Sequence, residues 1–174
     1  FDLVRQTMPS YGRAARPVDL FENPYPGGLP RLWHLRVETG WDGRDLVAVF
    51  NCERDMDVAV DFRRLGLPDG TSFHLWEFWE GRYLGRRRGG FTLPSKRATA
   101  RLVAVVPERP HPWILSTNFH FTQGVCELES VAWDGEGATL SGVLVRPAGS
   151  RGSLILSVPA PYRLPGEEIA PGIF

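Results

Sequence analysis

The sequence has few cysteines, a single lysine and no long apolar run. Two cysteines, Cys52 and Cys126, are too few for a disulfide framework. No apolar stretch approaches the roughly 20 residues of a membrane-spanning helix, and no signal-peptide pattern is present. We therefore expect a cytoplasmic location and no membrane partner.

Net charge is also absent, because 20 basic and 20 acidic residues cancel. A general nucleic-acid binder carries a basic excess, so no nucleic-acid partner is expected. The one basic cluster, Arg86 to Arg88, lies among glycines and is typical of a solvated hairpin tip.

Motifs for catalysis and metal binding are missing as well. The sequence has no Gly-x-Ser-x-Gly turn and no Cys-x-x-Cys, and no two of its four histidines are three or four residues apart. Asp55, Asp57 and Asp61 resemble a calcium loop only superficially, since Asp57 and Asp61 belong to the polar side of an alternating segment. We expect no metal and no cofactor.

What the sequence does have is strand periodicity. Met56, Val58, Val60 and Phe62 alternate with polar or small residues, and residues 33–38 alternate in the same way. Residues 46–50 and 102–106 are continuous apolar runs, which is typical of central strands covered on both faces. Further strands are expected at 71–79, 90–93, 126–133, 138–146 and 153–159. With 19 glycines and 15 prolines between these runs, the pattern predicts an all-β fold, an antiparallel β-sandwich with a small additional C-terminal sheet.

Prolines suggest two boundaries. Residues 1–30 contain five prolines and no sustained alternation, so we expect an extended linker segment there. Prolines at 107, 110 and 112 indicate the end of a sheet, which predicts a sandwich over 31–108 and a small β-rich tail over 109–174 packed on it. The chain starts at Phe1 rather than at methionine, which indicates part of a longer protein.

The segment 65–79 is rich in aromatic residues around one carboxylate, Glu77. Aromatic rings beside a carboxylate fit either a sugar-binding platform with an acid or the core of a sandwich. Glu77 and Glu80 are a conceivable glycosidase pair, but residues three apart in a strand point to opposite faces. Phe73 and Leu75 share one face of this strand, while Trp76 and Phe78 share the other. Either a bulge changes the phase between 75 and 76, or both faces are covered.

A polar cluster follows near the second boundary, at His111, Asn118, His120 and Gln123. It fits either a sugar-binding or interface edge or a strand whose Asn118, His120 and Thr122 face outward while Phe119 and Phe121 face inward. The second interpretation is favoured.

The order of several segments resembles the C-terminal β-sandwich of melibiase-type α-galactosidases and related glycoside hydrolases. The matching segments are 15–22, 30–35, 46–51, 65–67, 74–79 and 101–106, with a looser match over 111–124. The resemblance implies that the catalytic aspartates of such an enzyme lie in a separate (β/α)₈ barrel, upstream of the sandwich. Nothing in this chain matches the barrel, so no catalytic residue is carried over.

The sequence leaves three hypotheses for the function. The leading hypothesis is a non-catalytic domain of a glycoside hydrolase that packs on and stabilises the barrel, which predicts exposed apolar packing residues at Leu20, Phe21, Trp33 and Trp76. The alternative is a carbohydrate-binding module that stacks an oligosaccharide on exposed Trp41, Trp79 and Trp113. The third is a self-contained hydrolase using Glu77 and Glu80. The sequence does not determine the sugar or the oligomeric state.

Overall fold

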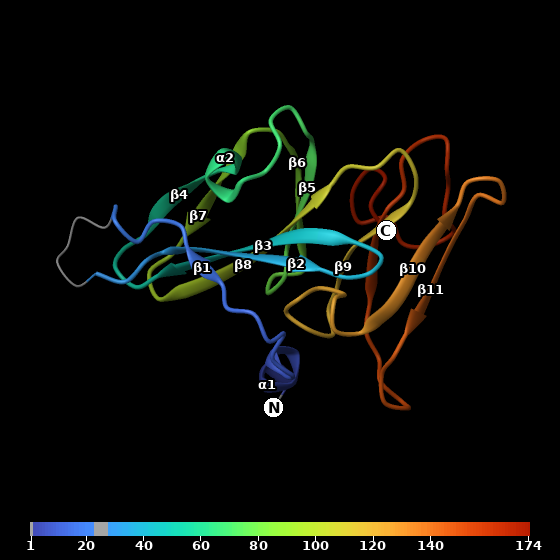
Figure 1. Cartoon of the computed structure of the whole chain (residues 1–174), viewed down its shortest axis with the longest axis horizontal. Helices are drawn as coiled ribbons and strands as arrows, with labels where there is room; N and C mark the ends of the chain where they lie inside the picture. The colour runs from blue at the N-terminus through green and yellow to red at the C-terminus, as the bar shows by residue number, and fades with distance from the viewer. Residues whose placement is uncertain (1, 23–27) are drawn as a thin grey trace. The chain divides into compact units, whose positions relative to one another are not determined.

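The computed structural model describes residues 2–22 and 28–174 (Figure 1). They form two compact units. The sandwich unit comprises the described residues of Arg13–Arg36 together with Asp45–Glu108, and the tail unit comprises those up to Gly12 together with Val37–Arg44 and Arg109–Phe174. The chain passes between the units within strands β2 and β3, because the tip of that hairpin belongs to the tail unit.

The sandwich unit is built on a six-stranded sheet in the order β1-β2-β3-β8-β5-β6, with a two-stranded β4–β7 sheet and one short helix (Figure 1). The bounds are β1 Arg16–Pro17, β2 Leu32–Glu38, β3 Gly43–Asn51, β4 Met56–Asp61, α2 Phe62–Leu65, β5 Phe73–Glu77, β6 Arg82–Arg87, β7 Gly90–Ser95 and β8 Thr99–Pro107. One hydrophobic core joins the two sheets and α2, and it includes Val47, Phe62, Leu75, Leu93 and Val103. The all-β sandwich prediction is confirmed.

Hydrophobic patterning accounts for these elements. The two apolar runs become β3 and β8, which pair with each other in the middle of the sheet, from Asp45 opposite Val105 to Asn51 opposite Thr99. The alternating segment becomes β4, and it ends where the Asp61 side chain accepts a hydrogen bond from the Arg63 amide and caps α2. Gly66 in a left-handed conformation then ends the helix.

The structure of β5 shows how apolar side chains on both faces of this strand are accommodated. Its pairing with β8 runs unbroken, while its pairing with β6 shifts between Leu75 and Trp76. The extra residue is therefore in β6, at Leu84, and the alternation within β5 is intact. Phe73 and Leu75 belong to the core, and all five residues of β5 are buried. A bulge is present, but it is the covering of both faces that accommodates the four apolar side chains.

The tail unit contains one short helix and two two-stranded sheets, β10–β11 and β12–β9. The bounds are α1 Asp2–Thr7, β9 Trp113–Thr117, β10 Leu128–Asp134, β11 Thr139–Leu144 and β12 Leu154–Ser157. Trp113, Ile114, Leu128 and Val131 form its buried cluster, with Trp41 among the half-buried side chains packed against it. The helix α1 lies in the segment expected to be extended, where no helical periodicity was evident.

The polar cluster after β9 is oriented differently from the favoured prediction. Residues 118–127 form turns rather than a strand, so strand alternation does not apply to them. His120 and Gln123 are fully buried, whereas Phe119 and Phe121 are half-buried. His120 is hydrogen-bonded to Thr122 and to the Pro9 carbonyl, which satisfies both of its ring nitrogens inside the fold.

Candidate functional site: an apolar pocket in the sandwich unit

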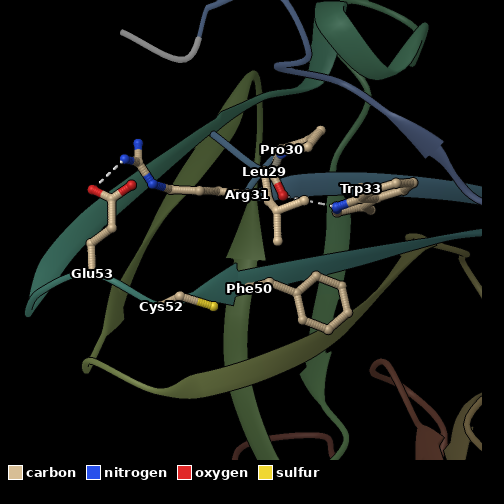
Figure 2. Close-up of a pocket in the computed structure, with 7 residues that line it drawn as sticks. All are labelled: Leu29, Pro30, Arg31, Trp33, Phe50, Cys52 and Glu53. Carbon is tan, nitrogen blue, oxygen red and sulfur yellow. Dashed lines mark hydrogen bonds and ion pairs between the residues drawn. The ribbon is translucent and has the colours of Figure 1, made fainter. Parts of the chain in front are cut away.

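A pocket of about 300 Å³ opens where β2 begins and β3 ends (Figure 2). Its lining consists mainly of apolar side chains with one charged pair and one thiol: Leu29, Pro30, Arg31, Trp33, Phe50, Cys52 and Glu53. The Trp33 indole is held in place by a 3.0 Å hydrogen bond from its Nε1 to the Pro30 carbonyl (Figure 2). The indole N–H thus has its hydrogen-bond partner within the fold, and the apolar part of the ring faces the pocket.

The rim of this pocket is exposed. Phe50 is 46% exposed and Leu29 is 76% exposed, although each is a large apolar side chain. Arg31 donates to Glu53 across 2.8 Å at one side (Figure 2). A mostly apolar hollow with a single ion pair suits an apolar side chain or ring of a partner. The lining contains no histidine and no second carboxylate, so the Cys52 thiol has no neighbouring imidazole base for acyl transfer and Glu53 has no partner carboxyl group for glycosyl transfer.

The four predicted packing residues are placed differently from one another. Trp33 lines the pocket, and Leu20 and Phe21 are 48% and 96% exposed. Trp76 is only 4% exposed, so its expected presence on an exposed apolar patch is wrong. The reason is that all five residues of β5 are buried, so neither face of this strand is open to solvent.

The three predicted sugar-stacking tryptophans also differ in how far they are exposed. Trp79 is 38% exposed and packs edge-on against Phe78, with ring centroids 4.8 Å apart. Trp41 is half-buried, and its Nε1 donates to the Leu128 carbonyl. Trp113 is 6% exposed, so the solvent-facing ring expected of it is wrong. It belongs to the tail cluster, where the Arg109 guanidinium lies over its ring at 4.2 Å.

Glu77 and Glu80 do not form a catalytic pair. Strand β5 ends at Glu77, so the expected opposite-face arrangement does not extend to Glu80. Both carboxylates instead contact Arg101, and the Glu80 amide donates to Glu77 Oε2 across 2.6 Å. Glu77 is fully buried, so a substrate cannot reach it.

Sequence reasoning missed a buried dyad in the sandwich unit. His34 Nε2 lies 2.7 Å from Asp45 Oδ1, and Arg36 pairs with the other carboxylate oxygen at 2.6 Å. Arg16 Nε donates to His34 Nδ1, so the proton of the imidazole is on Nε2 and the remaining nitrogen is engaged. This histidine has no lone pair available as a general base. The alternation around residue 34 suggested an outward-facing side chain and gave no signal of the pairing.

The tail unit holds a second buried polar group, centred on Arg44. Its guanidinium is 1% exposed and donates to Asp42 and to the carbonyls of Ile114, Leu115 and Gln123. Every one of these acceptors is internal, which makes Arg44 a structural cross-link rather than a ligand-binding group. In the described part of the chain, no group of three or more metal-ligating side chains lies close enough to hold an ion. The helices of the described residues are also too short and too polar to cross a membrane.

Comparison with known proteins agrees with the sandwich fold. Residues 32–103 match the family of the alpha galactosidase C-terminal beta sandwich domain. No curated protein matches the chain.

Among solved structures, a Bacillus halodurans C-125 protein assigned as an alpha-N-acetylgalactosaminidase is 17% identical, with a TM-score of 0.39 over 45% of this chain and 18% of that one. The GH27 β-L-arabinopyranosidase of Geobacillus stearothermophilus is 19% identical in its wild-type form, with a TM-score of 0.42 over 56% of this chain and 20% of that one. Its variant bound to arabinose is 21% identical, with the same TM-score over 55% of this chain and 20% of that one. The chain thus spans about a fifth of these enzymes.

The family match confirms the resemblance drawn from the sequence over β2 to β8. Residues 32–103 are similar to the alpha galactosidase C-terminal beta sandwich domain, and this match supports a glycoside-hydrolase-associated β-sandwich in that part of the chain.

Proposed function

We propose that this chain is a non-catalytic domain that docks on and stabilises a linked glycoside hydrolase barrel, and that the pocket around Trp33 and Phe50 is part of the docking surface. The observation that carries the proposal is the exposed apolar rim of this pocket. Large apolar side chains gathered on one surface mark an interaction site. Phe50 and Leu29 supply such a surface at the start of β2 and the end of β3.

Leu20 and Phe21 extend this surface. The carboxylate of the neighbouring Asp19 accepts hydrogen bonds from the amides of Arg31 and Leu32, at 3.1 and 3.0 Å. These bonds hold Asp19 beside the start of β2, and Leu20 and Phe21 follow it directly in the chain. Burying an exposed Phe side chain contributes about 1.5–3 kcal/mol. Docking through Phe21 and Phe50 can therefore stabilise an attached domain by several kcal/mol.

The experiment compares variants of the longer polypeptide that carries this sandwich. Phe21→Ser combined with Phe50→Ser removes two apolar contacts, and we expect the temperature of half-inactivation of its glycosidase activity to fall by about 5 °C. Ile169→Ser is the matched control, because Ile169 is 51% exposed but belongs to the tail unit. Equal inactivation temperatures for all three proteins would contradict the docking role. Glycosidase activity of the isolated chain on aryl glycosides would contradict the non-catalytic role.

A second candidate is carbohydrate binding, which the exposure of Trp79 favours. The exposed Glu80 follows it in the chain, so an apolar ring and a carboxylate are supplied by adjacent residues. Quenching of tryptophan fluorescence by an oligosaccharide, abolished in Trp79→Ala, would support this role. No quenching at millimolar oligosaccharide would exclude it.

A further inference from the structure

Strand β11 is the unprotected edge of a two-stranded sheet. Among the described residues it pairs only with β10, from Leu128 opposite Leu144 to Asp134 opposite Thr139. Beyond the strand the Val145 amide still donates to the Glu127 carbonyl, so the β10 side of the segment is occupied along its length. The opposite side presents a row of main-chain donors and acceptors, which is a template for another strand.

The side chains of this segment are unusually apolar for an exposed strand. Val143, Leu144 and Val145 are 48%, 42% and 59% exposed. Residues 139–145 contain no charge and no proline, and β-branched or leucine side chains predominate. Native edge strands are normally blunted by charges, prolines or bulges. Here the bulge and the charges lie in β10, at the Leu128/Ser130 shift and at exposed Glu129 and Asp134, so β10 is protected and β11 is not.

A two-stranded sheet is also too small to be stable without further pairing or packing. The inner face of β10–β11 packs against the tail cluster through Val131, Trp133 and Leu140. That contact does not cover Leu144 or the free edge. Residues 139–145 therefore combine a free strand edge, which can pair with another strand, with exposed apolar side chains.

We propose that β11 pairs with β11 of a second copy of this chain, antiparallel about a two-fold axis near Gly142, to give a continuous four-stranded sheet. An antiparallel strand edge is self-complementary, so one patch serves both copies. In this register Leu140 of each copy lies opposite Leu144 of the other, and the neutral segment 139–145 meets no like charge. Arg146 of one copy comes next to the 135–138 turn of the other, which carries exposed Glu136, so the two ends of the paired segment carry opposite charges. This assembly is independent of the docking surface in the sandwich unit.

Sedimentation velocity of the chain at micromolar concentration tests the proposal, and we expect a dimer. Val143→Lys places a charge on each copy near the two-fold axis, and it is expected to weaken dimerisation by about tenfold or more. Thr92→Lys is the matched control: Thr92 is an exposed β-branched residue of the other two-stranded sheet, and its variant is expected to stay dimeric. A monomeric wild-type chain, or a Val143→Lys chain that dimerises as well as the control, would overturn the proposal.

A cysteine pair keeps the test decisive if Val143→Lys does not fold. Residues 141 and 143 of opposite copies face each other in the proposed register, at a separation that a disulfide can bridge. Ser141→Cys with Val143→Cys, made with Cys52 and Cys126 changed to serine, is expected to give a covalent dimer on mild oxidation. Recovery of only monomer after oxidation would refute the pairing.

Discussion

At the scale of single residues, Glu77 shows how a carboxylate surrounded by aromatic rings becomes structural. Its Oε1 accepts from the Leu102 amide and faces Arg101, while its Oε2 accepts from the Glu80 amide. These partners satisfy a charge that would otherwise be costly to bury. The same partners close off the group from any substrate. The buried rings of Phe73 and Trp76 therefore belong to the packing of β5 and not to a binding platform.

Glu127 is a buried carboxyl of a different kind. It is 1% exposed, Thr117 Oγ1 donates to its Oε1, and Oε2 has no hydrogen-bond partner among the described residues. Burial raises the pKa of Glu127 above its ordinary value of 4.5, while Thr117, Arg146 and Arg44 act in the opposite direction. A raised folded-state pKa means that this group contributes full stability below about pH 4.5 and that its contribution declines as pH rises through the folded-state pKa.

Glu127→Gln should remove this decline, because an amide does not ionise. We expect the free energy of unfolding of the variant to fall less steeply than that of the wild type as pH rises above 4.5. Urea unfolding at a series of pH values measures the two slopes. Glu129→Gln is the control, because Glu129 is the exposed carboxylate two residues away and should leave the slope unchanged. Parallel curves for wild type and Glu127→Gln would show that Glu127 ionises equally in both states.

At the scale of elements, a strand could be predicted where apolar alternation or an uninterrupted apolar run marks it, whereas β1, β6 and β9 were not expected. β4 followed from the spacing of Met56, Val58 and Val60, and the central position of β3 and β8 followed from their uninterrupted apolar runs. Periodicity fails where the backbone leaves the strand conformation, as at 118–127, and there buried His120 and Thr122 were assigned to the surface. The pocket could not be predicted, since it depends on the proximity of Trp33 and Phe50 across two strands. Exposure of Trp113 was also misjudged, because a ring in an apolar strand gives no signal of which partners cover it.

The β4–β7 sheet depends on glycine at one position. Gly90 lies opposite Asp61, and a Cβ atom there would be 2.3 Å from the Val60 carbonyl oxygen. Gly90→Ala must displace main chain, and we expect it to lower the free energy of unfolding by about 3 kcal/mol. The adjacent Gly89 has φ +71° and open space where a methyl group would lie, so Gly89→Ala should cost only about 1 kcal/mol. Chemical denaturation compares them, and equal losses would contradict the steric argument.

At the scale of the whole molecule, the two units do not follow the order of the chain. Residues 37–44 come from the β2–β3 hairpin but belong to the tail unit. They bring Trp41, which packs against the tail cluster, and Arg44, which donates to three carbonyls between residues 114 and 123. The tail unit thus includes a segment that lies more than sixty residues before Arg109 in the chain.

This arrangement predicts that residues 109–174 do not fold alone. The fragment would lose Trp41 from its cluster and would leave the carbonyls of Ile114, Leu115 and Gln123 without the Arg44 donor. It would retain only two-stranded sheets, which are marginal in water. We expect far-UV circular dichroism of the fragment to show no cooperative thermal transition, while the full chain shows one. A cooperative transition in the fragment would mean that its own strands suffice, and that the buried guanidinium of Arg44 joins two segments already able to fold.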